Sequence, residues 1–491
     1  MRANGPKIGA AARTIVRIAV AASIALFGLA LGSNPSEAGQ KFVYATPAVY
    51  DTLDPHAVLD AGRVAPRLNL YDGLLRWEDN PPKLEPWLAE GYEVSPDGLT
   101  YRFTLRQGAT FHDASPVEAS DVVYSIERIL ALKKGAYSLF EASVAPGSTV
   151  AIDARTVEFH LTAPSAAFLA KVPEIHVVNE GLIRSKEVNG DWGQAWLASH
   201  DAGSGSYRLN RYDPAIGFNA KRFPEHFLGW NDKYLDEIEF RTIAASDARV
   251  LGLIAGDFHG IDGYLTPGEV GRLAVEPNIR LDEQEAMRIF YALIHNARPP
   301  MNDVNFRKAL SYAFDYDGFI GSVLSGSVTR NPGPLPNTMW GAPAGAAGYG
   351  FDLDAAREHL AMVEAPLREI TLGAVEGYPQ TRQAAAVLQH GLGKIGVEAR
   401  ILSEPWALAS ARMQHEQQMY DVLFLWRSSH YADPENWIGE MYACDQIGVR
   451  NSAWYCNPEV DALLAEARNT ADSAVRQSSY EKAAALVMED A

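Results

Sequence analysis

The stretch from Glu85 to Leu130, EPWLAEGYEVSPDGLTYRFTLRQGATFHDASPVEASDVVYSIERIL, decides the fold. Residues 95–98 (SPDG) form a turn signal, with Gly at the position that needs a positive φ. Residues 99–105 (LTYRFTL) then alternate apolar and polar side chains, which is typical of a strand with one buried face. Together these patterns predict a β-hairpin.

The hydrophobic period changes after Phe111. Residues 115–118 (SPVE) have the form of a capping box with Pro at the first helical position. Val122, Ile126 and Ile129 then recur at helical spacing. The pattern predicts a helix that begins beside Ser115, so the whole stretch is an α/β unit.

The same stretch resembles the signature region of the extracellular solute-binding proteins of family 5, the dipeptide- and oligopeptide-binding receptors of ABC importers. The likeness continues along nearly all of the chain after residue 40. The matching segments are residues 71–74 (YDGL), 205–207 (GSY), 304–315 (VNFRKALSYAFD) and 457–464 (NPEVDALL).

The resemblance implies an α/β, periplasmic binding protein-like fold of two hinged lobes, type II or cluster C-like, with an additional third domain. It places domain I at residues 39–70 and 203–288, domain II (the extra domain) at 71–202, and domain III at 289–491. Family members continue after a helix like Tyr480–Met488 and return to domain I. That return is missing here, so we expect the sequence to be incomplete.

The N-terminus predicts a cleaved secretory signal at residues 1–38. Four basic residues precede an apolar run from Ile18 to Leu31, and Ser36-Glu37-Ala38 offers small residues for cleavage. The alternative is a membrane anchor, but the run is short for a bilayer that needs about 20 residues. With no Cys near the cleavage point for a lipid anchor, we expect a Gram-negative periplasmic protein.

Composition and charge restrict the partners. The chain is 47% hydrophobic and 21% charged over 491 residues, which is ordinary for a soluble globular protein. Its formal net charge of −18 argues against nucleic acid and anionic lipid headgroups as partners, because both would be repelled. Solubility accounts for the charge equally well.

No motif for catalysis or cofactor binding is found. Gly391–Gly396 (GLGKIG) matches the dinucleotide pattern, but a helix precedes it and a strand follows, so it is a helix C-terminal stop. His415-Glu416 lacks the second His of a zinc protease helix. With no P-loop lysine, nucleophile elbow or Cys-x-x-Cys, we expect no enzyme, cofactor or metal site.

The two cysteines, Cys444 and Cys456, are predicted to form a disulfide. They lie 12 residues apart in an exported chain, and closing such a loop stabilises a fold by roughly 3 kcal/mol. The alternative is two reduced, buried thiols. The segment resembles a Cys-to-Cys arrangement of dipeptide-type members, which favours the disulfide.

Ligand contacts are predicted where the strand over residues 420–426 (YDVLFLW) enters the polar loop RSSHYADP. Strand ends of this kind face the crevice of an α/β protein. In peptide-binding relatives a Trp here flanks the ligand, and an Asp three residues later pairs with its free amino group. The Trp matches Trp426, but the Asp position falls on Ser429. Either Asp433 takes that role or the ligand is no ordinary free-amine peptide, and Asp433 is also explained as a turn former.

The resemblance adds Tyr50, because the family's Leu-Asp-Pro loop, here residues 53–55, lies beside the ligand groove. A Tyr beside a turn is otherwise simply packed. The predicted ligand-binding residues are Tyr50, Trp426, Arg427, Ser429, His430, Tyr431 and Asp433.

The sequence therefore predicts the substrate-binding protein of an ABC transporter, a monomer that captures a peptide-like solute by domain closure and delivers it to an inner-membrane permease. Within the class, the alternative is a receptor for an opine, an oligosaccharide or a metal chelate. Outside it, the alternatives are a secreted hydrolase, with paired carboxylates about 5 to 10 Å apart, and a peptide chaperone or sensor.

Overall fold

The computed structural model describes residues 40–80, 82–231, 234–343, 345–364, 368–470 and 472–490, and residues 40–491 form one compact unit. The predicted signal peptide at 1–38 lies outside the described residues. We call residues 40–287 the N-terminal lobe and residues 288–490 the C-terminal lobe.

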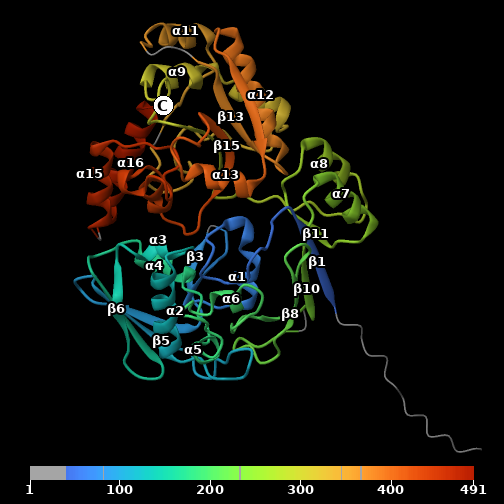
Figure 1. The fold of residues 1–491 in the computed structure, drawn as a ribbon, viewed down its shortest axis with the longest axis vertical. Helices are drawn as coiled ribbons and strands as arrows, with labels where there is room; N and C mark the ends of the chain where they lie inside the picture. The colour runs from blue at the N-terminus through green and yellow to red at the C-terminus, as the bar shows by residue number, and fades with distance from the viewer. Residues whose placement is uncertain are drawn as a thin grey trace, which may run out of the picture. The chain divides into compact units, whose positions relative to one another are not determined.

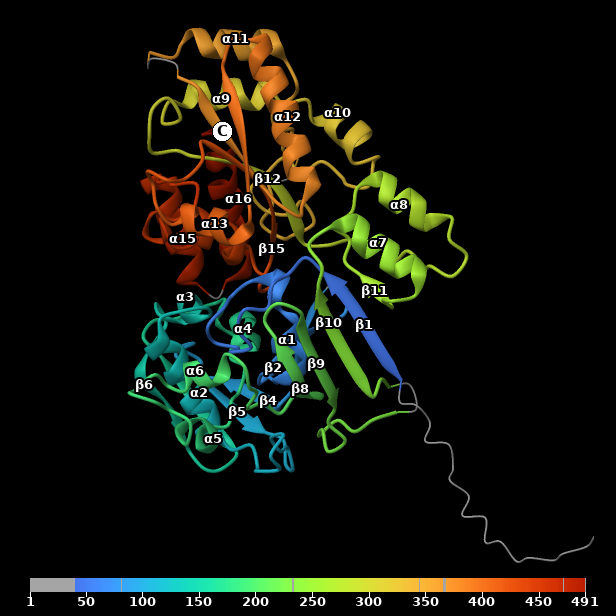
Figure 2. The same ribbon diagram turned by 45° about the vertical axis from the view of Figure 1, so that its right-hand side comes forward.

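A five-stranded sheet of the N-terminal lobe joins segments that are distant in the sequence. Its order is β11-β1-β10-β9-β8. Strand β1 runs parallel to β10, and the two lie side by side in Figure 2. The strands are β1 (Lys41–Thr46), β8 (Tyr207–Asp213), β9 (Gly217–Arg222), β10 (Glu237–Thr242) and β11 (Gly260–Ile261). This pairing follows the discontinuous course predicted for domain I, whose boundaries stay a prediction.

A second sheet of this lobe contains the predicted hairpin. Strands β4 (Ala89–Val94) and β5 (Thr100–Leu105) pair antiparallel, and Gly98 between them has a φ of 68°. Tyr101, Phe103 and Leu105 are buried, as the alternation predicts. The sheet order is β4-β5-β7-β6, with β6 (Val144–Ala151) and β7 (Thr156–Leu161), and a separate ribbon pairs β2 (Leu75–Glu78) with β3 (Lys83–Pro86).

The helix after this hairpin begins later than predicted. Helix α2 spans Ala119–Leu132, and Glu118 with Asp121 forms its capping box. Ser115 lies instead in a turn, where its backbone oxygen accepts from Phe111 and its hydroxyl donates to Asp113. The prediction that Ser115 caps the helix was therefore wrong, because its hydroxyl donates to the carboxylate of Asp113 in the loop.

Short helices complete the N-terminal lobe. They are α1 (Ala65–Leu70), α3 (Tyr137–Phe140), α4 (Phe168–Lys171), α5 (Glu180–Arg184), α6 (Gln194–Leu197), α7 (Ser246–Ala255) and α8 (Pro267–Ala274). Helix α7 ends at Gly256, whose φ of 82° is the left-handed conformation that glycine tolerates best.

A mixed sheet in the order β12-β15-β13-β14 forms the centre of the C-terminal lobe. Its strands are β12 (Arg288–Ile294), β13 (Ile370–Val375), β14 (Ala399–Glu404) and β15 (Val422–Ser428). Along β15, Leu423 and Leu425 belong to one hydrophobic cluster, whereas Val422 and Phe424 belong to another. The sheet therefore has a core on each face, as expected for a strand whose side chains point alternately to opposite sides.

Helices cover both faces of this sheet, and Figure 1 shows α12 running beside β13. The helices are α9 (Val304–Ala313), α10 (Tyr316–Gly318), α11 (Leu353–Ala361), α12 (Pro379–Lys394), α13 (Trp406–Met413), α14 (Glu440–Tyr442), α15 (Pro458–Arg468) and α16 (Ser473–Glu489). Helix α12 runs into the GLGKIG segment and β14 follows it, so the prediction of a helix stop is confirmed. No described helix has the length and apolarity needed to cross a membrane.

Several contacts join the two lobes, and three of them involve residues beyond the β15 region. The Tyr264 and Tyr378 rings meet edge to face with centroids 4.5 Å apart. Gln380 Nε2 donates to the Leu265 carbonyl at 2.6 Å, and Trp406 Nε1 donates to Asp60 Oδ2 at 3.3 Å. We call the residues of each lobe that contact the other lobe the lobe interface.

Candidate functional site

The predicted ligand strand, β15, places its last side chains on opposite faces of the sheet. Trp426 pairs with Phe290 of β12, and Arg427 pairs with Ile289. Because side chains alternate along a strand, Trp426 and Arg427 cannot line the same face. The end of β15 therefore offers one aromatic and one cationic surface.

The Trp426 side reaches the N-terminal lobe through Arg288. The Arg288 guanidinium carbon lies 5.1 Å from the Trp426 ring centroid and 4.3 Å from that of Tyr264. Arg288 also donates to the Tyr264 hydroxyl. Trp426 in turn packs on Phe290, with ring centroids 4.9 Å apart.

This stack contains unsatisfied donors. Within the described residues, Arg288 Nε and Trp426 Nε1 are buried and have no hydrogen-bond partner. In native proteins most buried polar groups are bonded, so an exception needs an explanation such as an absent ligand or water. These two donors lie beside each other where Arg288 contacts Tyr264 of the N-terminal lobe.

On the other face, Arg427 has only weak neutral partners. Its Nη1 lies 3.4 Å from the Arg450 carbonyl, and its Nη2 lies 3.3 Å from Ser452 Oγ. Burial, and then the charge of Arg450, lower the pKa of Arg427 to about 10. Arg427 forms no ion pair with any carboxylate in the described part of the chain.

The loop after β15 is fixed by Asn436. Its Oδ1 accepts from the His430 backbone N at 2.9 Å and from Ser429 Oγ at 3.1 Å, while its Nδ2 donates to Glu440 Oε2 at 3.0 Å. Ser429 Oγ also contacts the Tyr431 carbonyl. The loop is thus held in one shape before any ligand arrives, which lowers the entropy cost of binding.

His430 lies among cations. Its Nε2 is 3.3 Å from Arg450 Nη1. Burial, and then the charges of Arg450, Arg67 and Arg427, hold the pKa of His430 well below its usual value. The ring is therefore neutral at physiological pH and can accept or donate one hydrogen bond at each nitrogen according to its tautomer.

The Tyr431 side chain of this loop packs into the N-terminal lobe. Its buried ring belongs to the hydrophobic cluster built by the N-terminal lobe around Phe103 and Phe168. The Lys171 ammonium lies 5.5 Å from the Tyr431 ring centroid, and the Tyr431 hydroxyl donates to Glu440 Oε1 at 2.6 Å. The predicted loop therefore lies against both lobes.

Asp433 is paired inside its own lobe. Both of its carboxylate oxygens accept from Arg476 Nη2 at 2.9 Å, and burial raises its pKa in spite of that pairing. Ser429 has no charge at all. Neither of the two residues considered for the amine position therefore presents a free carboxylate, and their contact with a ligand stays a prediction.

Tyr50 lies in the core of the N-terminal lobe. Its ring is 2% exposed and meets Phe218 edge to face at 5.3 Å. Its carbonyl accepts from the Tyr212 hydroxyl at 2.8 Å. This is the packed arrangement that the residue alone indicates, and the ligand contact implied by the resemblance stays a prediction.

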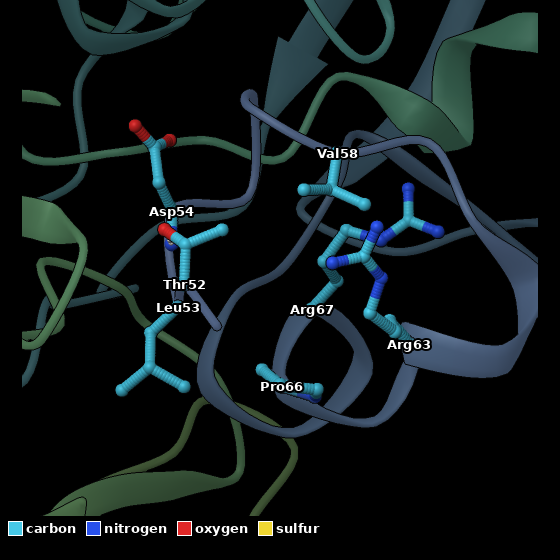
Figure 3. A pocket seen from close by; sticks show the side chains of 7 residues that line it. All are labelled: Thr52, Leu53, Asp54, Val58, Arg63, Pro66 and Arg67. Carbon is cyan, nitrogen blue, oxygen red and sulfur yellow. Dashed lines mark hydrogen bonds between the residues drawn. The ribbon is translucent and has the colours of Figure 1, made fainter. Parts of the chain in front are cut away.

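The N-terminal lobe contributes charges that the sequence did not single out. Arg67 of α1 forms a buried ion pair with Glu174. Arg67 also lines a cavity of about 10 Å³, and Figure 3 shows its side chain beside that of Arg63, apart from Asp54. A cavity of this size is at the limit for a single water, so it is no solute site by itself.

A second cavity lies within the C-terminal lobe. Its volume is about 680 Å³, and it is lined by residues that include Arg307, Trp454, Tyr455 and Asp490. Arg307 and Tyr455 already bond to Asp490, at 2.8 and 2.6 Å. No residue of the N-terminal lobe lines it, so it does not use both lobes.

The predicted disulfide is present, since Cys444 and Cys456 are bonded. The one grouping of metal-ligand residue types in the described residues consists of these two cysteines and Asp461. Oxidised cysteines have no thiolate to offer a metal, and Asp461 accepts from the Cys444 backbone N at 3.0 Å. The disulfide closes the loop that carries Arg450 and Ser452 toward Arg427.

Four residues at this site were missed by sequence reasoning: Arg67, Lys171, Arg288 and Arg450. Arg288 had a weak signal, because it directly precedes residue 289, where the predicted domain III begins. The other three come from segments more than 20 residues away from Trp426 and carry no motif. Only the folded chain brings them to the end of β15.

Comparison with known proteins agrees with this architecture. Residues 83–448 match the family described as bacterial extracellular solute-binding proteins, family 5 Middle. The chain is 28% identical over 447 residues to the probable D,D-dipeptide-binding periplasmic protein DdpA of Escherichia coli, covering 90% of this chain and 85% of that protein. It is 27% identical over 479 residues to heme-binding protein A of Haemophilus influenzae, covering 92% and 86%.

A solved structure shows the same fold. The periplasmic binding protein DppA of Helicobacter pylori, in complex with the peptide STSA, superposes with a TM-score of 0.84 at 24% identity, covering 92% of this chain and 91% of that one. This likeness confirms the predicted α/β, periplasmic binding protein-like fold class. The family match spans most of the described chain and includes the stretch from which the fold was predicted. The chain therefore belongs to the bacterial extracellular solute-binding proteins, family 5.

Proposed function

We propose that this protein is the periplasmic receptor of an ABC importer and that it captures a peptide-like solute between its lobes at the end of β15. The observation that carries the proposal is the pair of buried, unsatisfied donors, Arg288 Nε and Trp426 Nε1, in a stack that includes Tyr264 of the other lobe. A ligand that bonds to both lobes only when they meet shifts the equilibrium toward the closed state by its differential affinity.

Peptide recognition is supported by the relatives. The Escherichia coli relative is named a D,D-dipeptide-binding protein, and the Helicobacter pylori structure holds a tetrapeptide. A peptide offers backbone donors and acceptors at regular spacing, which suits the polar loop that follows β15. We propose that Trp426 packs on the peptide and that Ser429 and His430 face its backbone.

A non-peptide solute is the second candidate, and one observation favours it. No free carboxylate stands at Ser429 or Asp433 for a peptide ammonium, because Asp433 is bonded to Arg476. An unpaired ammonium in a desolvated site costs several kcal/mol. The relative named heme-binding protein A indicates that the family fold also serves other solutes.

Binding without catalysis is part of the proposal, together with export, a permease partner and a monomeric state. The family consists of solute-binding proteins, and the periplasmic location is named for the Escherichia coli and Helicobacter pylori relatives. A turnover assay by mass spectrometry on every solute that binds is expected to recover the solute unchanged. Recovery of hydrolysed peptide would favour the secreted hydrolase instead.

Thermal shift with a library of peptides and small polar solutes tests the proposal. A ligand present at 100 times its Kd stabilises the folded state by about 2.7 kcal/mol, which raises Tm measurably. We expect Trp426→Ala to lose most of this shift. Trp230→Ala is the matched control, because the contacts of the Trp230 ring with Tyr207, Tyr234, Arg222 and the Phe223 carbonyl all lie in the N-terminal lobe.

Two results would contradict the proposal. One is a ligand-induced shift of equal size in wild type and Trp426→Ala, which would place the solute elsewhere. The other is the absence of any stabilising solute together with normal solute uptake in a deletion strain.

A further inference from the structure

The end of β15 and the N-terminal lobe segment that contacts its loop carry cations that lack carboxylate partners in the described residues. Within the described residues, Arg427, Arg288 and Lys171 form no ion pair. Arg427 and Arg288 lie on opposite faces of the sheet at the end of β15, and Lys171 approaches from the N-terminal lobe above the Tyr431 ring. All three are only partly exposed.

The neighbouring carboxylates are already used. Glu440 accepts from Tyr431 and Asn436, and it lies 3.3 Å from Arg450 Nε. Glu174 is taken by Arg67. These two acids balance Arg450 and Arg67, so the positive charge of Arg427 and Lys171 remains uncompensated.

This excess is opposite to the charge of the whole chain, which is −18. A partly buried cation without a counter-ion is costly, and charge-assisted bonds to a carboxylate or phosphate are the strongest compensation available. The neutral contacts of Arg427, at 3.3 and 3.4 Å, are too long to serve in that way. His430, in direct contact with Arg450, adds no negative charge either.

We propose that the solute is an anion, that its carboxylate or phosphate groups outnumber its ammonium groups, and that Arg427 and Lys171 bind those anionic groups from the two lobes. The inference deepens the proposed function and rests on it, since it names the charge of the solute captured at the end of β15. It also accounts for Ser429, because a carboxylate at that position would repel such a ligand.

A peptide series that varies only charge tests the inference by calorimetry or thermal shift. The series is Ala-Ala-Ala-amide, N-acetyl-Ala-Ala-Ala-amide, N-acetyl-Ala-Ala-Ala and N-acetyl-Ala-Glu-Ala, with N-acetyl-Ala-phosphoserine-Ala to separate phosphate from carboxylate. We expect affinity to rise about tenfold or more from the neutral to the singly anionic peptide, and again to the doubly anionic one. Affinity for the anionic peptides is expected to fall as salt rises.

Variants assign the effect to the two cations. Arg427→Gln and Lys171→Gln are each expected to remove about tenfold of the preference for anionic over neutral peptides, whereas Arg427→Lys keeps part of the preference. The two residues lie in different lobes, so loss of folding in one variant does not disable the other. Arg400→Gln is the control, because Arg400 pairs with Glu369 at a surface where both side chains are about half exposed.

A second series separates failure of the inference from failure of the proposed function. Glutarate, tricarballylate and inorganic phosphate are titrated against sodium chloride at equal ionic strength. If peptides fail but these anions bind through Arg427, the peptide assignment is wrong and the anion inference stands. If peptides bind equally whatever their charge, the proposed function stands and the inference is overturned. If neither series binds, both are wrong.

Discussion

The two ends of strand β15 handle buried charge in opposite ways. At its start, Asp421 is surrounded by donors: Arg298 lies 3.0 Å away, Arg368 2.6 Å away, and the Thr371 backbone N 2.8 Å away. At its end, Arg427 has two long contacts to neutral oxygens and no carboxylate within the described residues. A satisfied charge network fixes a structure, whereas an unsatisfied one at an interface leaves room for a ligand.

The pKa values express the same difference. Burial alone would raise the pKa of Asp421, but hydrogen bonds from Arg368 and Thr371 outweigh it and lower the pKa to about 2. At the other end no partner offsets burial, and the pKa of Arg427 falls to about 10. The start of β15 therefore stabilises its charge, and the end carries a cost that an anionic solute can relieve.

Asp421→Asn is expected to have the largest effect on stability. The change leaves two arginines without their carboxylate, and breaking such a buried network costs roughly 3–5 kcal/mol. Urea unfolding measures this loss, while ligand affinity should stay within about twofold. Asp354→Asn is the control, because Asp354 forms an ion pair on the surface, and it is expected to cost less than about 0.5 kcal/mol. Equal losses in both variants would contradict the contrast.

Removing the disulfide affects the other end. The double change Cys444→Ser with Cys456→Ser opens the loop that carries Arg450 and Ser452, and it is expected to cost about 3 kcal/mol. Because this loop supports Arg427, ligand affinity should fall as well, unlike in Asp421→Asn. Unfolding curves and calorimetry on the same samples measure both quantities. A loss of stability with unchanged ligand affinity would show that the disulfide loop does not support the binding site.

The pH dependence of stability distinguishes the two ends. The folded pKa of Asp421, about 2, lies below its ordinary value of 3.8, so its contribution is complete above about pH 4 and is lost as pH falls through 2. The folded pKa of His430 also lies below its ordinary value of 6.5, so its contribution is present above pH 6.5 and is lost as pH falls below that.

Of these two groups, only His430 should therefore change its contribution to the free energy of unfolding between pH 6.5 and 5. Wild type is expected to lose up to about 1.4 kcal/mol per pH unit more than His430→Gln, measured by urea unfolding at each pH. His56, His176 and His295 also have lowered pKa values, but they are common to both proteins and cancel in the comparison. Parallel curves for the two proteins would show that His430 is not desolvated in the folded state.

Tyr431→Phe should have the smallest effect. It removes the hydroxyl that donates to Glu440 but keeps the ring packed against the N-terminal lobe. Glu440 retains Asn436 and Arg450, so we expect a loss of about 1 kcal/mol in the free energy of unfolding. A loss as large as that of Asp421→Asn would mean that hydrogen bonds near the end of β15 stabilise the fold as much as those at its start.

Local sequence patterns were enough to predict most elements near the site. The hairpin turn at 95–98, the helix stop at residues 391–396 and the strand that ends near Trp426 all follow from signals within a few residues. The start of α2 was missed because Ser115 bonds to a loop carboxylate, and a capping pattern does not distinguish the two uses.

The chemistry of the site was less predictable, because its partners come from far along the chain. Both oxygens of Asp433 bond to Arg476, which lies 43 residues later in the chain, and no local pattern indicates this pairing. Lys171 reaches Tyr431 from the other lobe, and Arg288 lies beside Trp426 only through strand pairing. Such contacts depend on tertiary structure and leave no local signal.

A crystal structure with the most stabilising anionic probe tests the central claim most directly. We expect the solute at the end of β15, with an anionic oxygen within hydrogen-bonding distance of the Arg427 guanidinium and the Trp426 ring packed against the ligand. Density for the solute in the cavity beside Trp454 and Asp490, with Arg427 still bonded only to Arg450 and Ser452, would contradict it.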